Sequence, residues 1–300
     1  DLAKAVVKFA PSALPESAIL TLTNSPVFPE LYASGQHEGV FFVIMQDFSG
    51  GNLLDRIANG IKLQSVISAI RQIALALDEL HRIGYVHGDI KPEHIVFTQN
   101  GGPGLIDYGC ASPIGETATN INPDRPIAQL SPGYASPEQI TGRSLDGRSD
   151  IYSLGIVFYQ VLTGHLPYTD PDTQTMLQKH VQEPIPRLPN HLASLQPVID
   201  LLMAKRPEQR YQSGKMLSDA LTSIAMDTAL PDIKIKTQAI KTQEIFVLSA
   251  ELRTVALEPL QQQKRTRLKL RRRIALQSSA FLLITGVLLS AVFVLRDLVT

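Results

Sequence analysis

The sequence predicts an α+β fold with two lobes, one built mainly of strands and the other mainly of helices. Two short apolar runs near the start, Val6–Phe9 and Phe41–Met45, are typical of strands. From Leu63 onward the apolar residues recur at helical spacing, and helical patterns then dominate as far as Met226. The chain has 300 residues and 44% hydrophobic content, which is enough to bury a substantial core.

The long periodic segment lies in the middle of the chain. Its apolar residues from Leu63 to Leu80 predict an amphipathic helix that ends at Gly84. Two short strands follow, at His94–Phe97 and Leu105–Ile106, and the turn residues between them predict a hairpin. The other predicted elements are strands at Val6–Phe9 and Phe41–Met45, a short helix at Glu16–Thr23, a long loop over residues 110–137, and helices at Ile151–Thr163, Leu192–Ala204 and Ser213–Met226.

The composition excludes some classes of function. Lysine plus arginine equals aspartate plus glutamate at 28 each, so the overall charge gives no support for nucleic-acid binding. The single cysteine, Cys110, excludes an intramolecular disulfide and fits a reducing compartment. The charge is uneven along the chain, because residues 264–273 contain seven basic residues and no acidic one.

A membrane-spanning helix is predicted at residues 274–295. These twenty-two residues carry no charge. As a helix they would extend about 33 Å, enough to cross a bilayer core. A buried soluble helix is the alternative. It is disfavoured because the segment is apolar on every face and directly follows Arg271, Arg272 and Arg273. We therefore expect a single-pass protein of the inner (cytoplasmic) membrane, with the residues before 274 in the cytosol.

The run from His87 to His94 contains the most informative chemistry of the chain. Asp89 is followed two residues later by Lys91, and a second carboxylate, Asp107, comes eighteen residues after Asp89. Two carboxylates and a lysine directed at one point suit phosphoryl transfer, in which charge must be neutralised and a hydroxyl group oriented. Each short pattern alone is typical of a surface turn, so the prediction depends on their combination.

In these residues the chain resembles the bacterial eukaryotic-type serine/threonine protein kinases, over about residues 8–225. The resemblance implies a two-lobed protein-kinase-like fold, ATP as the phosphoryl donor, Mg²⁺ or Mn²⁺ as the metal, and protein substrates. It rests on four motifs in the family's order: the run from His87 to His94, Asp107-Tyr108-Gly109, Ser136-Pro137-Glu138, and the helix that begins near Asp150.

The resemblance implies roles in the transfer itself for five residues. Asp89 matches the catalytic aspartate, which accepts or orients the proton of the substrate hydroxyl, and Lys91 matches the lysine that steadies the γ-phosphate. Asp107 matches the aspartate that holds the metal against the β- and γ-phosphates. Lys8 is similar to the strand lysine that contacts the α- and β-phosphates, and Glu16 is similar to the helix glutamate paired with that lysine.

The resemblance also implies roles in adenine binding, substrate docking and support. Met45 resembles the gatekeeper, and the backbone from Gln46 to Phe48 resembles the hinge that hydrogen-bonds adenine. Ser131 takes the place of a threonine that bonds the catalytic aspartate and lysine. The remaining assignments are Gly133 and Tyr134 in the same substrate-docking segment, Glu138 and Arg210 as a buried ion pair, and Asp150 as the residue that holds the backbone of the catalytic loop.

Three departures from the family pattern bear on activity. His94 stands where these kinases carry the asparagine that binds the second metal. It would bind Mn²⁺, weaken metal binding or face away, since imidazole suits Mn²⁺ better than Mg²⁺. No glycine-rich loop precedes Lys8, because the chain begins seven residues before it, so we expect a truncated N-lobe and poor ATP binding. Gly88 replaces the arginine that anchors a phosphorylated activation loop, which argues against control by one loop phosphate.

The leading prediction is a membrane-anchored serine/threonine protein kinase. The alternative is a catalytically impaired pseudokinase that acts as a membrane-tethered signalling scaffold, which His94 and the missing loop favour. A lipid or small-molecule kinase is a third option, which the docking segment disfavours. The predicted divisions are a partial kinase N-lobe (1–45), a kinase C-lobe (46–228), a juxtamembrane linker with the basic cluster (229–273), the membrane helix (274–295) and a short outer tail (296–300).

The predicted linker carries two threonines, Thr237 and Thr242, each followed three residues later by an isoleucine. Phosphothreonine with an aliphatic residue at that spacing resembles a ligand of forkhead-associated domains, so a protein with such a domain is a predicted partner. An ordinary amphipathic linker helix would give the same spacing.

Overall fold

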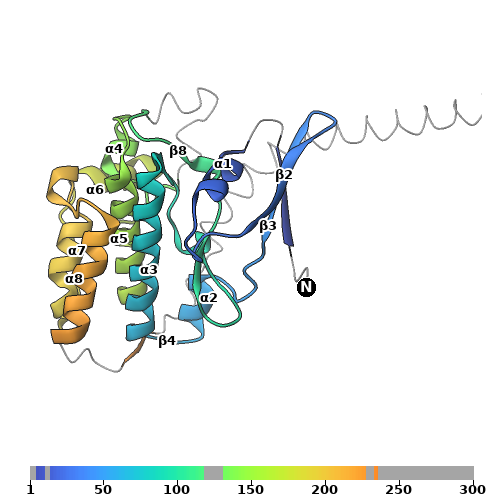
Figure 1. The fold of residues 1–300 in the computed structure, drawn as a ribbon. Helices are drawn as coiled ribbons and strands as arrows, with labels where there is room; N and C mark the ends of the chain where they lie inside the picture. Colours follow the sequence, from blue (N-terminus) through green and yellow to red (C-terminus); the bar gives the residue numbers. More distant parts are fainter. Residues whose placement is uncertain (1–4, 11–13, 118–130, 228–232, 236–300) are drawn as a thin grey trace, which may run out of the picture. The chain divides into compact units, whose positions relative to one another are not determined.

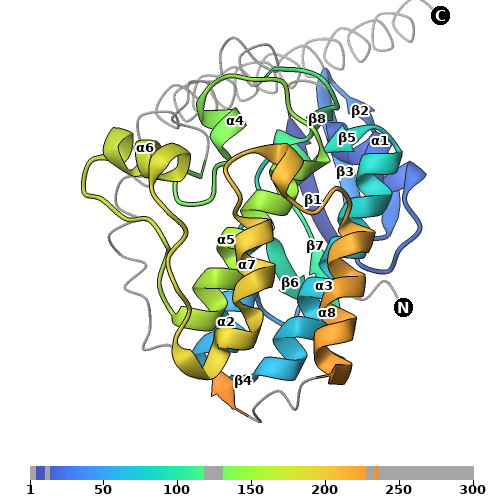
Figure 2. The same cartoon turned by 90° about the vertical axis from the view of Figure 1, so that its left-hand side faces the viewer.

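A computed structural model of the protein describes residues 5–10, 14–117, 131–227 and 233–235, and all the structural statements below concern these residues (Figure 1). A three-stranded antiparallel sheet with one short helix forms the first part, and a larger helical part follows (Figures 1 and 2). The α+β class predicted from the sequence is confirmed. The predicted membrane helix, Thr237 and Thr242 lie outside the described residues.

The sheet contains strands β1 (Ala5–Ala10), β2 (Leu31–His37) and β3 (Val40–Gln46), in the order β1-β3-β2. Strands β2 and β3 are joined by Glu38 and Gly39, which both have positive φ, as in the tight turns that match the twist of a hairpin. Helix α1 (Pro15–Leu22) follows β1 and buries Ile19. Strand β2 was not predicted, because its sequence has little of the apolar alternation that identifies a strand.

The helical part is built around two buried helices, α3 (Leu63–Arg82) and α5 (Gly147–Thr163). The apolar face of α3 that the sequence predicts is almost inaccessible to solvent, with Ile73, Leu77 and Leu80 at 0% exposure. Helix α5 is buried along most of its length, because α3 packs against one side and α7 (Gln196–Leu202) against another. Helix α8 (Gly214–Asp227) covers α3 (Figure 2).

Short elements between α3 and α5 position the candidate site. They are β5 (Tyr85–Val86), the 3₁₀ turn η1 (Pro92–His94), β6 (Ile95–Phe97), β7 (Pro103–Leu105), the 3₁₀ turn η2 (Tyr108–Cys110), β8 (Ser112–Pro113) and α4 (Pro137–Ile140). The predicted hairpin is confirmed as the β6–β7 pair. His94 lies in η1 and not in the strand, because Pro92 starts a turn at its first position.

Several elements were missed or differ from the prediction. The predicted helix at Leu192–Ala204 is a 3₁₀ helix, η4 (Asn190–Leu195), followed by α7, since Pro197 stands in the first turn of α7 and cannot continue a helix from before. Part of the predicted linker forms strand β9, which pairs with β4. The bounds not yet given are α2 (Leu53–Ala58), β4 (Ile61–Lys62), α6 (Thr173–Gln182), the 3₁₀ turn η5 (Pro207–Gln209) and β9 (Lys234–Ile235).

The helices in the described part of the chain do not meet the requirements for a membrane-spanning helix. Within those ranges no helix combines the length and the apolar character that crossing a bilayer requires. The segment that carries this prediction, residues 274–295, falls beyond them.

Candidate active site

The carboxylate of Asp150, in the first turn of α5, holds the loop that carries Asp89. It is 1% exposed and accepts hydrogen bonds from the backbone amides of His87 (2.8 Å) and Gly88 (2.9 Å). A third contact joins its Oδ2 to Nε2 of His81, at 2.8 Å. Because the carboxylate fixes two successive amides, the backbone immediately before Asp89 is attached to the most buried helix of the fold.

Asp89 and Lys91 point into the same space from this loop. The Lys91 ammonium donates to Oδ2 of Asp89 at 2.8 Å and to Oγ of Ser131 at 3.0 Å. The Asp89 side chain is 9% exposed, so its carboxylate is nearly desolvated yet remains next to a cation. An aspartate in this setting is oriented by the lysine and can accept a proton from a hydroxyl group.

A second cluster of charges lies where the sheet faces the hairpin. Lys8 of β1 contacts Oε1 of Glu16 at 2.9 Å and Oδ1 of Asp107 at 2.7 Å. Glu16 is 1% exposed, and a separation of eight positions from Lys8 suffices because α1 begins soon after β1. Asp107 precedes η2 with a left-handed backbone (φ 69°). Lys8 of β1 therefore connects Glu16 of α1 with Asp107, which directly precedes η2.

His94 lies between the two clusters. Its Nδ1 faces the backbone carbonyl of Asp89 at 2.8 Å, and its Nε2 faces Oδ2 of Asp107 at 3.2 Å. The ring can donate to both oxygens only when both of its nitrogens carry protons. Of the three alternatives for His94, the one in which its ring faces away does not apply. The imidazole bridges the loop of Asp89 and the carboxylate of Asp107.

The charges of this cluster shift one another's pKa values. Hydrogen bonding from His94 lowers the pKa of Asp107 far below its usual range, and Lys8 adds to this against the opposing effect of burial. Burial by itself lowers the pKa of Lys8, but Asp107 and Glu16 outweigh burial and the pKa is raised. The lysine is therefore held as a cation and Asp107 as an anion, which is the pattern needed to bind phosphate and metal.

The rings of Phe28, Tyr108 and His87 pack next to one another inside the protein. The ring of Tyr108 lies 5.1 Å from the ring of His87 and 5.9 Å from that of Phe28. The Tyr108 hydroxyl donates to the carbonyl of Leu105 at 2.7 Å. Burial lowers the pKa of His87, although Asp150 opposes this, which favours the neutral ring. The packing of these three rings could not be predicted from the sequence, because Phe28, His87 and Tyr108 are far apart along the chain.

The three residues assigned to adenine binding lie at the end of β3. Met45 is 4% exposed within the sheet, and the Gln46 amide donates to the carbonyl of Glu30 at 2.9 Å. Phe48 follows and is 8% exposed. A side chain at Gly104 of β7 would collide with its ring, so the connection from the sheet to α2 packs directly against the hairpin.

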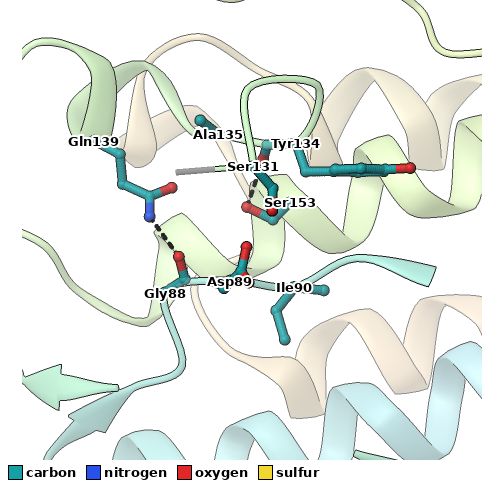
Figure 3. Close-up of a pocket in the computed structure, with 8 residues that line it drawn as sticks. All are labelled: Gly88, Asp89, Ile90, Ser131, Tyr134, Ala135, Gln139 and Ser153. Atoms are coloured by element: carbon teal, nitrogen blue, oxygen red, sulfur yellow. Dashed lines mark hydrogen bonds between the residues drawn. The ribbon is translucent and has the colours of Figure 1, made fainter. Parts of the chain in front are cut away.

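The docking segment borders a small recess next to Asp89 (Figure 3). Its Tyr134 hydroxyl donates to Gln160 at 2.8 Å, and its carbonyl accepts from Ser153 at 2.8 Å, so both ends of Tyr134 are attached to α5. Gly133 lies close to Leu166, and a Cβ there would be 2.9 Å from Cδ1 of that leucine. The recess has a volume of about 10 Å³ and is lined by Gly88, Asp89, Ile90, Ser131, Tyr134, Ala135, Gln139 and Ser153.

Glu138 and Arg210 form a bidentate ion pair beneath this segment, with contacts of 2.6 and 2.9 Å. The Arg210 side chain is 0% exposed and that of Glu138 is 6% exposed. Ser149 of α5 donates to the same carboxylate at 2.7 Å. Burial raises the pKa of Glu138, but the bonds from Arg210 outweigh it and the pKa is lowered, so the carboxylate remains charged. Breaking such a buried pair leaves one uncompensated charge.

Two residues outside the four sequence motifs, His81 and Gln139, hold the loop of Asp89 from two sides. His81, at the end of α3, contacts Asp150, and Gln139 of α4 donates to the carbonyl of Gly88 at 2.8 Å. The Ser136-x-x-Gln139 spacing is a capping-box signature, so the sequence indicates that Gln139 caps the start of α4. Nothing in the sequence indicates the contact with Gly88, which is fifty-one residues away.

The residues present fit a nucleotide and a divalent metal that are held jointly. Among the described residues no group of three or more histidine, cysteine, aspartate or glutamate side chains is arranged to hold a metal by itself. Asp107 is the accessible oxygen donor, with a side chain 45% exposed, and His94 offers a nitrogen beside it. Such a pair needs phosphate oxygens to complete a coordination shell.

This two-lobed fold, with a lysine and two aspartates meeting between a small sheet and a helical lobe, defines the architecture of a nucleotide-dependent phosphotransferase. Residues 3–222 match the protein kinase domain family, and this match covers well over half of the chain. The chain belongs to the protein kinase domain family. The resemblance to bacterial eukaryotic-type serine/threonine protein kinases stated from the motifs is confirmed.

Two relatives and one solved structure illustrate the similarity. The chain is 28% identical to the serine/threonine-protein kinase PknL of Mycobacterium tuberculosis over 73% of its length, and 29% identical to PknB of the same organism over 80%. It spans 56% of PknL and 40% of PknB. The kinase PK-1 of the Cydia pomonella granulovirus shares the fold, with a TM-score of 0.61 and 21% identity over 71% of this chain and 83% of its own.

Proposed function

We propose that the protein is a serine/threonine protein kinase that transfers the γ-phosphoryl group of ATP to serine or threonine hydroxyls of other proteins. The observation that carries the proposal is the contact of Lys91 with both Asp89 and Ser131. It joins a proton-accepting carboxylate, a phosphate-binding cation and the docking segment in one cluster. A cluster of this kind suits phosphoryl transfer, in which the protein mainly positions the reacting groups and neutralises charge.

Asp89 would receive the proton of the substrate hydroxyl. Its carboxylate lies beside the recess of the docking segment, and Lys91 holds its Oδ2. Lys91 also neutralises charge that develops on the transferred group, because its ammonium lies between the aspartate and Ser131. Ser131 fixes the lysine and ties the position of the docking segment to the position of the base.

On the nucleotide side, Lys8 would bind phosphate oxygens while Glu16 keeps its ammonium in place. Asp107 would hold a divalent metal, which supplies charge neutralisation on the phosphates when it is bound. In the structure the Asp107 carboxylate contacts Lys8 and His94. Substrate binding must therefore exchange these two protein contacts for contacts with phosphate and metal.

Replacing Asp89 tests the proposal most simply. Asp89→Asn keeps the size of the side chain but removes the proton acceptor, so we expect phosphate transfer from radiolabelled ATP to myelin basic protein to fall at least about 100-fold. Asp200→Asn, which neutralises a half-exposed carboxylate of α7 that contacts Arg187 and Gln196, should transfer phosphate at the wild-type rate. Equal labelling by the Asp89→Asn variant and the wild type would reject Asp89 as the base.

His94 supports a second candidate function, a pseudokinase scaffold, because its imidazole already occupies the metal side of Asp107. We propose instead that His94 changes the choice of metal. A nitrogen ligand beside one carboxylate favours Mn²⁺ over Mg²⁺. The scaffold would apply if no divalent metal binds with nucleotide at this site.

The choice of metal is measurable without turnover. We expect binding of Mn²⁺ with a non-hydrolysable ATP analogue, followed by electron paramagnetic resonance, to be displaced by Mg²⁺ about tenfold more easily in His94→Asn than in the wild type, because an amide oxygen suits the harder ion. His37→Asn, on the exposed strand β2, serves as the control. An unchanged preference in His94→Asn would show that the imidazole is not a ligand.

We further propose that the kinase domain is held at the inner membrane by residues 274–295 and that Thr237 and Thr242 recruit a forkhead-associated domain after phosphorylation. The uncharged run after the basic cluster supports the first proposal, and the threonine–isoleucine spacing supports the second. Pull-down with an isolated forkhead-associated domain should capture the phosphorylated wild type at least about tenfold better than Thr237→Ala/Thr242→Ala. Equal capture would reject the linker threonines.

A further inference from the structure

We propose that Gln139 is a positioning residue for Asp89, acting through a hydrogen bond to the carbonyl of Gly88. The inference rests on the proposed function and names a residue that the family motifs do not assign. Gln139 belongs to α4, directly after the docking segment, whereas Gly88 belongs to the loop of the candidate base (Figure 3). The bond therefore joins the part of the protein that would hold substrate to the part that would deprotonate it.

Both polar groups of Gly88 are held by side chains. The Gly88 amide donates to Oδ1 of Asp150 at 2.9 Å, and its carbonyl accepts from Nε2 of Gln139 at 2.8 Å. The next carbonyl along, that of Asp89, faces Nδ1 of His94 at 2.8 Å. The peptide groups on either side of the Asp89 Cα atom are thus fixed. A rotation of the Gly88–Asp89 peptide would move the carboxylate of Asp89 relative to the recess.

The orientation of the Gln139 amide is set by its other end. Its Oε1 accepts from the Ser136 amide at 2.9 Å and from the Ser136 hydroxyl at 3.1 Å. Because an amide nitrogen cannot accept from these donors, Nε2 must point the opposite way, toward Gly88. Gln139 is 5% exposed, and the neighbouring Glu138 is fixed by Arg210. The donor to Gly88 is therefore held in place by contacts within the protein.

Gly88 has a backbone that suits this arrangement. Its φ is 77°, and a Cβ there would lie 2.9 Å from the carbonyl oxygen of Cys110. Glycine adopts this conformation without steric cost and brings the start of the long loop close. Because Gly88 has no side chain, it cannot bind a phosphorylated loop as the arginine that it replaces would. The bond from Gln139 connects loop and docking segment without a phosphate, so the site would be assembled in the unmodified protein.

Gln139→Glu is the decisive substitution in the full 300-residue chain. A glutamate keeps the oxygen that accepts from Ser136 and replaces only the donor with a second oxygen, which repels the Gly88 carbonyl. With ATP and myelin basic protein, we expect kcat to fall about 10- to 100-fold, because small displacements of a positioned base are costly. The KM for ATP should stay within about twofold of wild type, since the phosphate contacts are not altered.

Two comparisons separate positioning from stability. Thr141→Ala removes a hydrogen bond on the same short helix, to Pro137, and touches no part of the loop, so its kcat should match that of wild type. Gln139→Met fills the volume but offers neither donor nor acceptor, and should lose as much kcat as Gln139→Glu. A wild-type kcat in Gln139→Glu, or an equal loss in Thr141→Ala, would overturn the proposal.

A measurement without turnover keeps this inference separate from the proposed function. Hydrogen–deuterium exchange of the peptide that contains Gly88 and Asp89 should be at least about fivefold faster in Gln139→Glu than in wild type or Thr141→Ala. The faster exchange is expected even if the wild type transfers no phosphate. In that case the kinase proposal fails, but the positioning of the Gly88–Asp89 peptide by Gln139 is still supported. Unchanged exchange in Gln139→Glu would overturn the proposed positioning by Gln139, whether or not the protein transfers phosphate.

Discussion

The rest of the site depends on one buried carboxylate, that of Asp150. A charge inside a protein is costly unless hydrogen bonds replace its water, and Asp150 receives them from His81 and from the amides of His87 and Gly88. The same helix donates from Ser149 to Glu138 and from Ser153 to the carbonyl of Tyr134. The candidate base and the docking segment are therefore both positioned from α5, and their separation is set by one rigid element.

The second constraint is electrostatic and joins the sheet to the helical part. Lys8, Glu16, Asp107 and His94 form a chain of contacts in which each acid faces a possible proton donor. Lys8 and Asp107 are held in their charged forms by this arrangement, as the directions of their pKa shifts indicate. These four side chains thus satisfy one another's charges. In the proposed function these contacts would open for phosphate and metal, and His94, which faces Asp107, would then affect the choice of metal as well as the structure.

Much of this could be predicted from the sequence, because the information is local. The periodic apolar face of α3 and the β6–β7 hairpin follow from patterns within a few residues, and the motif around Asp89 indicates its chemistry directly. Strand β2 and helix α6 could not be predicted in this way, since their apolar residues have no clear period and tertiary packing decides their structure.

The contacts that complete the site could not be predicted from the sequence either, because they join residues far apart along the chain. Gln139 and Gly88 are fifty-one residues apart, and Asp150 and His81 are sixty-nine apart, so only the folded chain brings them together. The position of His94 was similarly open. Its residue type raised the question of metal binding, but the structure was needed to show that its ring faces Asp107.

Residue-resolved amide hydrogen exchange in Asp150→Asn tests the central role of Asp150 most directly. Asparagine keeps one acceptor oxygen and turns the other into a donor, so at least one of the His87 and Gly88 amides should exchange about tenfold faster or more, as expected for losing a hydrogen bond to a charged group. The amide of Ile156, deep in α5, should keep its wild-type protection. Unchanged exchange at both His87 and Gly88 would contradict the account.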